Sequence, residues 1–149
     1  MMKYISHRGN INGKDVTNEN KLDYIDTALS MGYDVEIDIW FEDFKLLLGH
    51  DGGLYVVDLF WLTERYDKLW LHCKNLEAVF YFKELDFDFN YFWHQNDDIT
   101  ITSQGYFWTY PGKKISNNSI AVLPEVDNFE NIEHCFGICS DYIERYKLI

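Results

Sequence analysis

Two kinds of side chain in this sequence are placed where they could do chemistry: histidines that follow short apolar segments, and a pair of carboxylates two positions apart. His7 and His50 each follow such a segment, and Glu36 and Asp38 alternate with apolar residues within 34–40. Two carboxylates shielded from water repel each other unless a cation lies between them. Because both offer oxygen ligands, the pair predicts a divalent-cation site suited to Mg²⁺ or Ca²⁺.

Further polar residues occur at the ends of later apolar segments. They are His72, Lys74, His94, Gln95, Glu125 and Asp141. In a parallel α/β barrel the carboxyl ends of the strands converge on one face, where active sites lie. A single histidine at a strand end is usually a hydrogen-bonded structural residue, but four of the five histidines fall at such ends. We therefore interpret the set as one site, although Glu36 and Asp38 would face solvent if their strand were an edge strand.

The elements that must position these residues alternate between strand-like and helix-like segments, a pattern typical of βα units with a mostly parallel sheet. Strands are expected at 3–6, 34–40, 69–74, 90–93, 100–109, 120–123 and 136–139, with a short apolar run at 44–49 that ends before His50. Helices are expected from about residue 19 to Gly32, at 57–66, at 76–85 behind an Asn75 cap, and at 141–146.

The chain length limits the architecture that these elements can form. A complete TIM-type (β/α) barrel needs about 250 residues, whereas this chain has 149. No helix pattern is present in 97–118, where two apolar runs flank a Pro111-Gly112 turn. We therefore expect an α/β fold with a reduced or incomplete TIM-like barrel, in which the strands are mostly parallel and several crossover helices are shortened or missing.

Composition and charge exclude several classes of protein. With 47% hydrophobic and 18% aromatic residues, the chain is expected to form a packed core as a single domain spanning residues 1–149. The formal net charge of −12 argues against a general nucleic-acid or anionic-membrane surface, because both need an excess of Lys and Arg. No apolar run approaches the roughly 20 residues of a transmembrane segment, and no signal peptide is evident. We expect a cytoplasmic protein.

The cysteines and the aromatic clusters favour structural roles. Cys73, Cys135 and Cys139 are an odd number and form no Cys-x-x-Cys pair, so free buried thiols are expected. Aromatic residues gather at 91–93 and 106–110. Large rings can fill a small barrel, but Trp93 or Trp108 could instead line a substrate pocket.

The ordered motifs of the first third of the chain resemble the glycerophosphodiester phosphodiesterase family, which belongs to the phospholipase-C-like phosphodiesterases on β/α barrels. The resemblance is carried by Ser6-His7-Arg8-Gly9, Glu19-Asn20, Leu22-Asp23-Tyr24-Ile25, Ala28, Met31-Gly32, Glu36-Ile37-Asp38 and Gly49-His50-Asp51. Each motif is short, but their order and spacing together form a specific signal. The chain resembles a short, divergent member of this family.

The resemblance implies a role for each of these residues. His7 and His50 would be the acid and base of phosphodiester cleavage, Arg8 and Lys74 would bind the phosphate, and Glu36 and Asp38 would hold the divalent ion. Elementary chemistry agrees, because two histidines flanking a phosphate can deprotonate the attacking oxygen and protonate the leaving one. The guanidinium of Arg8 offers a bidentate fork that suits phosphate.

Later in the chain the sequence departs from the family. Family members usually place a metal-binding Glu two residues before the lysine of the third strand, where this chain has His72-Cys73-Lys74. Either His72 is a metal ligand, which would favour a softer ion, or the ion is held by Glu36, Asp38 and water or another acid such as Glu125. The Gly137–Asp141 segment resembles the closing strand of the family, and Trp93, His94, Trp108 and Asp141 are candidates for lining the pocket.

The leading hypothesis is therefore a divalent-metal-dependent phosphodiesterase that acts on a small or head-group phosphodiester, with a cyclic phosphate as an intermediate where the substrate has a neighbouring hydroxyl. Three alternatives stay open. They are a lyase that stops at the cyclic phosphate, a catalytically retired phosphate- or metal-binding module, and a structural α/β domain whose histidines are satisfied locally. The open edges of an incomplete barrel would also favour a homodimer.

Overall fold

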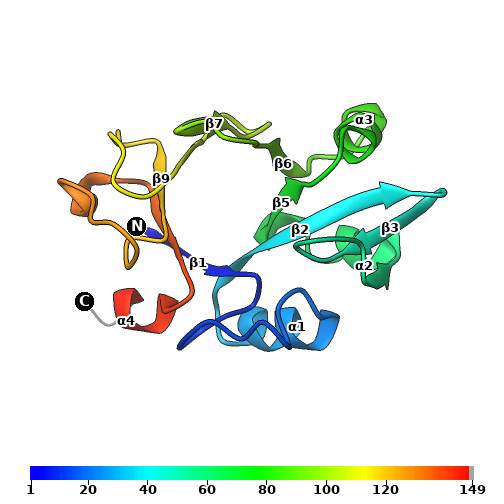
Figure 1. Cartoon of the computed structure of the whole chain (residues 1–149), viewed down its shortest axis with the longest axis horizontal. Helices are drawn as coiled ribbons and strands as arrows, with labels where there is room; N and C mark the ends of the chain where they lie inside the picture. The colour runs from blue at the N-terminus through cyan, green and yellow to red at the C-terminus, as the bar shows by residue number, and fades with distance from the viewer. Residues whose placement is uncertain (148–149) are drawn as a thin grey trace.

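The computed structural model describes residues 1–147 and shows a mixed α/β fold in which a mostly parallel sheet curls into a partial barrel (Figure 1). The strands are β1 Lys3–His7, β2 Asp34–Glu42, β3 Lys45–Leu48, β4 Tyr55–Val57, β5 Leu69–Cys73, β6 Asn90–Trp93, β7 Ile99–Ile101, β8 Phe107–Thr109, β9 Ser119–Val122 and β10 Gly137–Ser140. The helices are α1 Leu22–Ser30, α2 Leu59–Thr63, α3 Leu76–Glu84 and α4 Ile143–Lys147, with short 3₁₀ helices at Tyr66–Lys68 and Ile132–His134.

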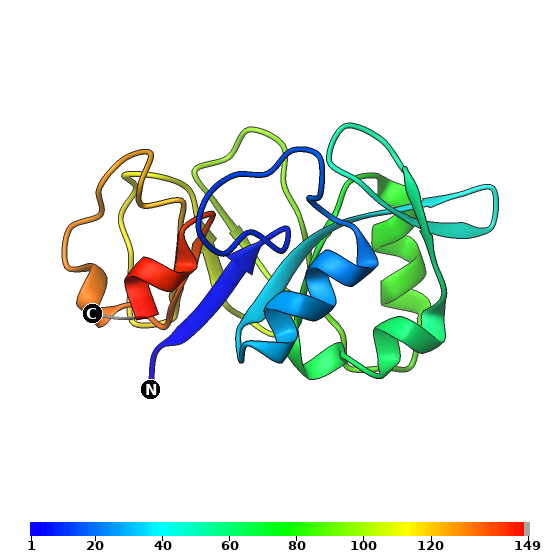
Figure 2. The same ribbon diagram turned by 90° about the horizontal axis from the view of Figure 1, so that it is seen from below.

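The pairing of the strands brings their carboxyl ends to one rim. Strands β6, β5, β2, β1, β10, β9 and β8 are neighbours in that order, and every pair in this row is parallel. Strand β7 is antiparallel to β8. In the β3–β4 hairpin, β3 pairs antiparallel with the last four residues of β2, Ile39–Glu42. In Figure 2 the loop that follows β1 arches over the side of the molecule opposite the N-terminus. The predicted convergence of strand ends on one face is thus confirmed.

The ring of strands is nearly closed between β6 and β7 (Figure 1). The backbone N–H of Ser103 donates to the carbonyl of Tyr91 at 2.7 Å, and the Thr100 hydroxyl donates to the carbonyl of Trp93 at 2.9 Å. No strand ladder joins β6 to β7 in the described residues. These isolated contacts therefore replace the ladder that would complete a barrel.

Helices cover the first half of the sheet and are nearly missing from the second half. Helices α1, α2 and α3 fall in the connections that lead from β1 to β6, whereas only the Ile132–His134 3₁₀ turn falls between β8 and β10. Figure 1 places α1, α2 and α3 outside the ring of strands. The expectation that crossover helices are shortened or missing is confirmed.

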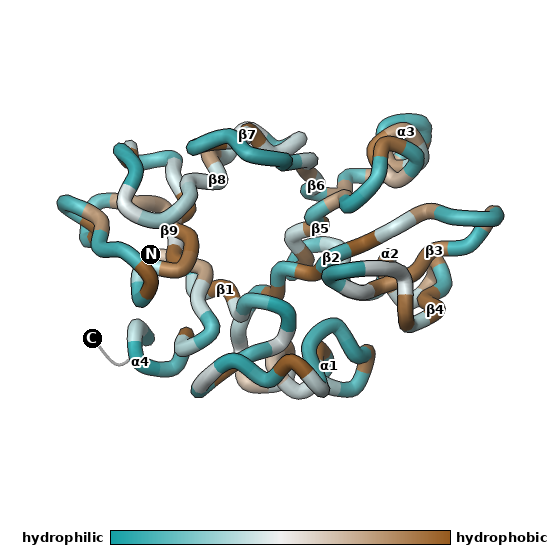
Figure 3. The backbone as a smooth tube through the Cα atoms, viewed as in Figure 1, coloured by the Kyte–Doolittle hydropathy of each residue, from teal (hydrophilic) through white to brown (hydrophobic). Residues whose placement is uncertain are grey.

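Alternation along the strands separates an outer core from the barrel interior. The side chains of Val35, Ile37 and Ile39 of β2 pack with those of Ile25 in α1 and Phe82 in α3. The hydrophobic segments of Figure 3 accordingly coincide with β1, β2, β5 and β9, while the loops are mostly hydrophilic. Because successive side chains of a strand point to opposite faces, Asp34, Glu36 and Asp38 of the same strand must point inward.

Aromatic rings fill the interior below Glu36 and Asp38, whereas Asp34 lies at the amino end of β2, where Trp70 Nε1 donates to its Oδ2 at 3.1 Å. Trp108 packs against Phe92 and Trp70, with ring centroids 4.7 and 5.7 Å apart, and Ile5 and Ile120 belong to the same buried cluster. The interior of a small barrel is a packed core rather than a pore. The apolar lower half therefore forms a floor beneath a polar upper half.

Several element boundaries differ from those predicted. Helix α1 begins at Leu22 and not near residue 19, and α4 begins at Ile143 and not at residue 141. The segment 57–66 is not one helix, because Val57 pairs with Leu46 in β4 and the Asp58 side chain caps a helix that begins at Leu59. The segment 100–109 is a hairpin of β7 and β8 that turns at Gly105, whose φ is +90°. The run at 44–49 begins as strand only at Lys45, because Phe44 lies in a turn with φ +61°.

The three cysteines are free and buried, as predicted. Burial raises the pKa of the Cys73 thiol to about 12 and also raises the pKa of Cys139. Neither thiol is therefore ionised near neutral pH, and neither is suited to nucleophilic or metal-binding roles. Among residues 1–147, no helix is long and apolar enough to cross a membrane.

Candidate active site

Five polar side chains meet inside the rim formed by the carboxyl ends of β1, β2, β5 and β10. We call them the strand-end cluster: His7, Glu36, Asp38, His72 and Asp141. The sheet register explains the meeting, because His7 lies beside Glu36 across β1 and β2, and Asp38 lies beside His72 across β2 and β5. All five were predicted as site residues.

His7 is held in one orientation by Asp141. Its Nδ1 lies 2.7 Å from Asp141 Oδ1, and the Asn10 side-chain amide donates to the same oxygen at 2.8 Å. With Nδ1–H donating to a carboxylate, Nε2 is left to accept or release a proton. That Nε2 lies 3.7 Å from Glu36 Oε2, so the reactive edge of the ring faces the acidic pair.

The charges around His7 favour its protonated form. Burial lowers the pKa of His7, but the hydrogen bond to Asp141 and the charge of Glu36 outweigh burial and raise it above its ordinary value. Burial raises the pKa of Asp141, but the hydrogen bond and charge of His7 outweigh it and lower that pKa. The two residues therefore form an ion pair around mildly acidic pH.

Glu125 supports the Asp141 side of this pair. Its carboxylate accepts hydrogen bonds from the Ser140 hydroxyl at 2.9 Å and from the backbone N–H of Asp141 at 3.0 Å. The structure thus places Glu125 as a support for the end of β10 and not within the strand-end cluster.

Asp38 is fixed on one side by positive and amide groups. Its Oδ2 lies 3.0 Å from Arg8 Nε and accepts from the Asn20 side-chain amide at 2.9 Å, while Asn20 Oδ1 accepts from the backbone N–H of Asp38. Arg8 also donates to Glu19 at 3.0 Å. Burial raises the pKa of Asp38, but His72 and Arg8 outweigh burial and lower it below its ordinary value. Asp38 is therefore ionised.

One oxygen of Asp38 and one of Glu36 face His72. His72 Nδ1 lies 3.2 Å from Asp38 Oδ1 and 3.7 Å from Glu36 Oε1, and one ligand atom from each of the three residues lies within 4.8 Å of the others. Asp38 Oδ1 and Glu36 Oε2 are buried and have no hydrogen-bond partner. Buried polar atoms are nearly always paired, so these residues fit a bound cation.

His50 lies outside the strand-end cluster. Its side chain is 44% exposed and pairs with Asp51 at 2.8 Å; no hydrogen bond or ion pair joins it to the cluster among the described residues. It does line a cavity of about 300 Å³ together with Arg8, Glu19 and Asn20. Because Arg8 contacts both this cavity and Asp38, the cavity adjoins the cluster.

The other predicted residues occupy the periphery or the floor. Lys74 is half-buried after β5, and its side chain makes no ion pair with any described residue. Trp93 at the end of β6 is 37% exposed, whereas Trp108 lies 2% exposed in the aromatic floor. His94 stacks on Tyr110, with ring centroids 3.8 Å apart. The centroid of the His94 ring lies 6.3 Å from that of His72.

Sequence reasoning assigned no role to several residues that shape the site. Asn10 orients Asp141, Asn20 orients Asp38, and Tyr110 adds a hydroxyl that is buried without a hydrogen-bond partner. Burial, together with the charges of Glu36 and Asp38, raises the pKa of Tyr110, so the hydroxyl stays protonated. The signal available in the sequence was the asparagine content of the loop after β1, because Asn20 adopts a φ of +66°, which Asn tolerates better than most residues.

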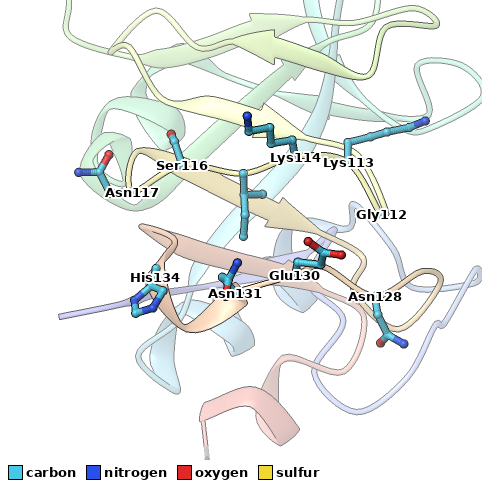
Figure 4. A pocket seen from close by; sticks show the side chains of 10 residues that line it. Gly112, Lys113, Lys114, Ser116, Asn117, Asn128, Glu130, Asn131 and His134 are labelled. Atoms are coloured by element: carbon cyan, nitrogen blue, oxygen red, sulfur yellow. The ribbon is translucent and has the colours of Figure 1, made fainter.

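A second cavity of about 540 Å³ lies away from the strand-end cluster, between the loop at 112–117 and the segment at 128–134 (Figure 4). Lys113, Lys114, Glu130 and His134 line it with exposed side chains. It shares no residue with the cluster, and its mixed charges select no particular ligand.

A scan against protein-family models and searches of curated proteins and solved structures found no match. Function is therefore inferred from the chemistry of the strand-end cluster.

Proposed function

We propose that this protein is a divalent-metal-dependent phosphodiesterase that cleaves a small glycerophosphodiester-like substrate on a reduced TIM-like β/α barrel. One observation carries the proposal: the free Nε2 of the Asp141-held His7 faces Glu36, and Glu36 also belongs to the buried Glu36, Asp38 and His72 ligand set. A proton-transfer group and a cation site thus share one carboxylate. This combination, together with the sequence resemblance to glycerophosphodiester phosphodiesterases, supports phosphodiester chemistry above other reactions.

Each residue of the cluster has a defined task in this reaction. Glu36 and Asp38 would hold the cation with His72, and a bound divalent ion would offset the charge that develops on the nonbridging phosphate oxygens. His7 Nε2 exchanges a proton with either the attacking or the leaving oxygen, and Asp141 keeps that nitrogen facing the phosphate. Arg8 and Asn20 keep the Asp38 carboxylate ionised and in place.

His50 is proposed as the second proton-transfer residue. The cavity that it lines also contains Arg8, so a diester extending from the cluster into this cavity would lie between His7 and His50. A volume of about 300 Å³ is at the lower end of small-molecule sites. It fits a glycerol or head-group moiety.

The bond changes depend on the substrate. Where a hydroxyl neighbours the phosphate, one histidine takes the hydroxyl proton as its oxygen bonds to phosphorus, and the other protonates the leaving oxygen as its bond to phosphorus breaks. Water then opens the resulting cyclic phosphate. A lyase would omit this second stage.

Phosphorus NMR of the products tests the proposal. Metal-loaded protein is incubated with a panel of glycerophosphodiesters, beside His7→Gln and a matched control, His134→Gln, whose side chain is exposed and remote from the cluster. We expect a phosphomonoester product, and a loss of roughly 100-fold or more in rate for His7→Gln only, because general acid–base groups contribute about that much.

Other outcomes of this experiment separate the alternatives. A cyclic phosphate that persists would make the protein a lyase. Equal rates for wild type and His7→Gln would contradict the proposal. If no diester is cleaved while the ion still binds, the metal-binding module is favoured, with His7 serving only as a partner of Asp141.

A further inference from the structure

We propose that the cation site of the strand-end cluster selects a transition-metal ion of the Fe²⁺ to Zn²⁺ range over Mg²⁺ and Ca²⁺, because His72 supplies a nitrogen ligand. The inference rests on the proposed function, whose ion site it specifies. It also chooses between the two alternatives that the sequence left open, a softer ion bound through His72 and an Mg²⁺ or Ca²⁺ ion held by oxygen ligands.

The position of His72 is set by two neighbouring strands. Its backbone lies beside Asp38 in the register of β2 and β5, and its ring stacks on Phe92 of β6, with centroids 4.9 Å apart and an interplanar angle of 16°. The ring is therefore oriented by packing, and Nδ1 is directed at the carboxylates.

The spacing of the atoms matches shared coordination. Neighbouring ligands bound to one ion at about 2.0–2.2 Å lie roughly 2.8–3.6 Å from one another in octahedral or tetrahedral geometry. His72 Nδ1 lies 3.2 Å from Asp38 Oδ1 and 3.7 Å from Glu36 Oε1. The three ligand atoms all lie within 4.8 Å of one another, so rotation of the two carboxylates toward His72 Nδ1 would bring the three atoms onto one ion.

The rest of the cluster leaves Asp38 Oδ1 without a hydrogen bond. Arg8 and Asn20 use the other oxygen of Asp38, so Asp38 Oδ1 remains buried without a hydrogen bond. Glu125 is committed to Ser140 and Asp141, and within residues 1–147 no additional acid joins the ligand group. The third protein ligand is thus an imidazole and not a carboxylate.

An imidazole in this position changes which ion is favoured. Mg²⁺ and Ca²⁺ take oxygen ligands, whereas imidazole suits Fe²⁺, Co²⁺, Ni²⁺ and Zn²⁺, whose affinity for mixed nitrogen and oxygen sites is greater. The competing state is an imidazolium of His72 that itself balances the two carboxylates, and in that state no ion is needed.

Metal titration of the metal-stripped 149-residue chain distinguishes these states. Calorimetry measures the affinity for Zn²⁺, Co²⁺, Mg²⁺ and Ca²⁺, and the visible ligand-field bands of Co²⁺ report its coordination. We expect one Co²⁺ per chain, bound at least about 10-fold more tightly than Mg²⁺. The decisive variant is His72→Glu, which supplies an oxygen ligand at the same position. It should lower the ratio of Co²⁺ to Mg²⁺ affinity at least about 10-fold and alter the Co²⁺ bands.

Two controls keep the result interpretable. His134→Gln removes an exposed histidine outside the cluster and should leave affinities and bands unchanged, and circular dichroism with thermal melting verifies that His72→Glu is folded. Mg²⁺ binding as tight as Co²⁺ binding in wild type, an unchanged ratio in His72→Glu, or no ion binding at all would each overturn the inference.

The outcomes also separate this inference from the proposed function. Tight Co²⁺ binding that depends on His72, with no diester cleaved in any metal form, would retain the inference and reject the phosphodiesterase. Cleavage supported by Mg²⁺, with an ion preference unchanged in His72→Glu, would retain the phosphodiesterase and reject the inference about the ion.

Discussion

His7 and Asp141 lie 134 positions apart, yet their side chains form one of the shortest polar contacts of the site, at 2.7 Å. The contact exists because β1 and β10 are parallel neighbours, with Ser6 beside Ser140. The first and last strands in the chain therefore bring these two side chains together. Their protonation should be visible in the stability of the whole protein.

The two pKa shifts define a pH window for that stability. The pKa of His7 is raised above 6.5, so its contribution is complete below pH 6.5 and is lost as pH rises through the raised value. The pKa of Asp141 is lowered below 3.8, so its contribution is complete above pH 3.8 and is lost as pH falls through the lowered value. The ion pair therefore stabilises the fold most between these two limits.

Asp141→Asn should expose this window. Charge-assisted hydrogen bonds contribute about 1.5–3 kcal/mol, so the variant should melt several degrees below wild type at about pH 5 and by a smaller margin at about pH 8.5. Thermal melting followed by circular dichroism at the two pH values makes the comparison. A difference in melting temperature that does not change with pH would show that the carboxylate acts only as a neutral-histidine partner.

At the scale of elements, the turn after β1 is a tightly packed connection to the site. Gly9 has a φ of +94°, and a Cβ at this position would lie 2.6 Å from Tyr24 Cδ2 of α1. The Tyr24 hydroxyl in turn donates to Asn10 Oδ1. The turn, α1 and the residue that orients Asp141 are thus packed as a unit.

Gly9→Ala and Gly105→Ala form a matched pair that measures this packing. Both glycines have a φ near +90°, but a Cβ at Gly105 would meet nothing within 4 Å. The left-handed conformation costs an alanine about 1 kcal/mol, and a steric overlap in a packed region adds about 1–3 kcal/mol. Urea unfolding should therefore show a clearly larger loss of unfolding free energy for Gly9→Ala. Equal losses of unfolding free energy would mean that Tyr24 of α1 moves aside without a measurable energetic penalty.

The sequence was informative where local pattern and tertiary structure agree. Strict alternation in 34–40 predicted β2 and the inward direction of Glu36 and Asp38, and the Asn75 cap correctly marked the start of α3. The helix expected at 57–66 is shorter in the structure, Leu59–Thr63, because Val57 belongs to the edge strand β4. Val57 pairs with Leu46, and helical periodicity does not encode this pairing.

The sequence predicted which residues form the candidate site better than it predicted which side chains contact one another there. The sequence pattern identified the strand-end residues. It did not show that the guanidinium of Arg8 contacts Asp38 and Glu19, or that the Asn20 side chain hydrogen-bonds to Asp38. Such contacts depend on loop conformations, here a φ of +59° at Arg8 and +66° at Asn20. The sequence pattern gives the side of the sheet and not the loop geometry.

At the scale of the whole molecule, the fold brings positively charged side chains together at one place in a strongly acidic chain. A chain with a net charge of −12 gathers Arg8, His7 and His72 around the inward carboxylates, above a floor of packed aromatic rings. The floor keeps water away from the lower side, which strengthens the electrostatic interactions above it. The cluster thus lies inside the rim formed by the carboxyl ends of the strands, while Asp34 lies toward the opposite end and pairs with Lys3.

The most direct test of this account is the rate of phosphodiester cleavage by metal-stripped protein before and after a divalent ion is restored, for wild type beside Glu36→Gln. Glu36 touches both His7 and the ligand set, so the account predicts that cleavage needs the ion and falls roughly 100-fold or more in Glu36→Gln. Cleavage that is equally fast without the ion, or unchanged in Glu36→Gln, would contradict it.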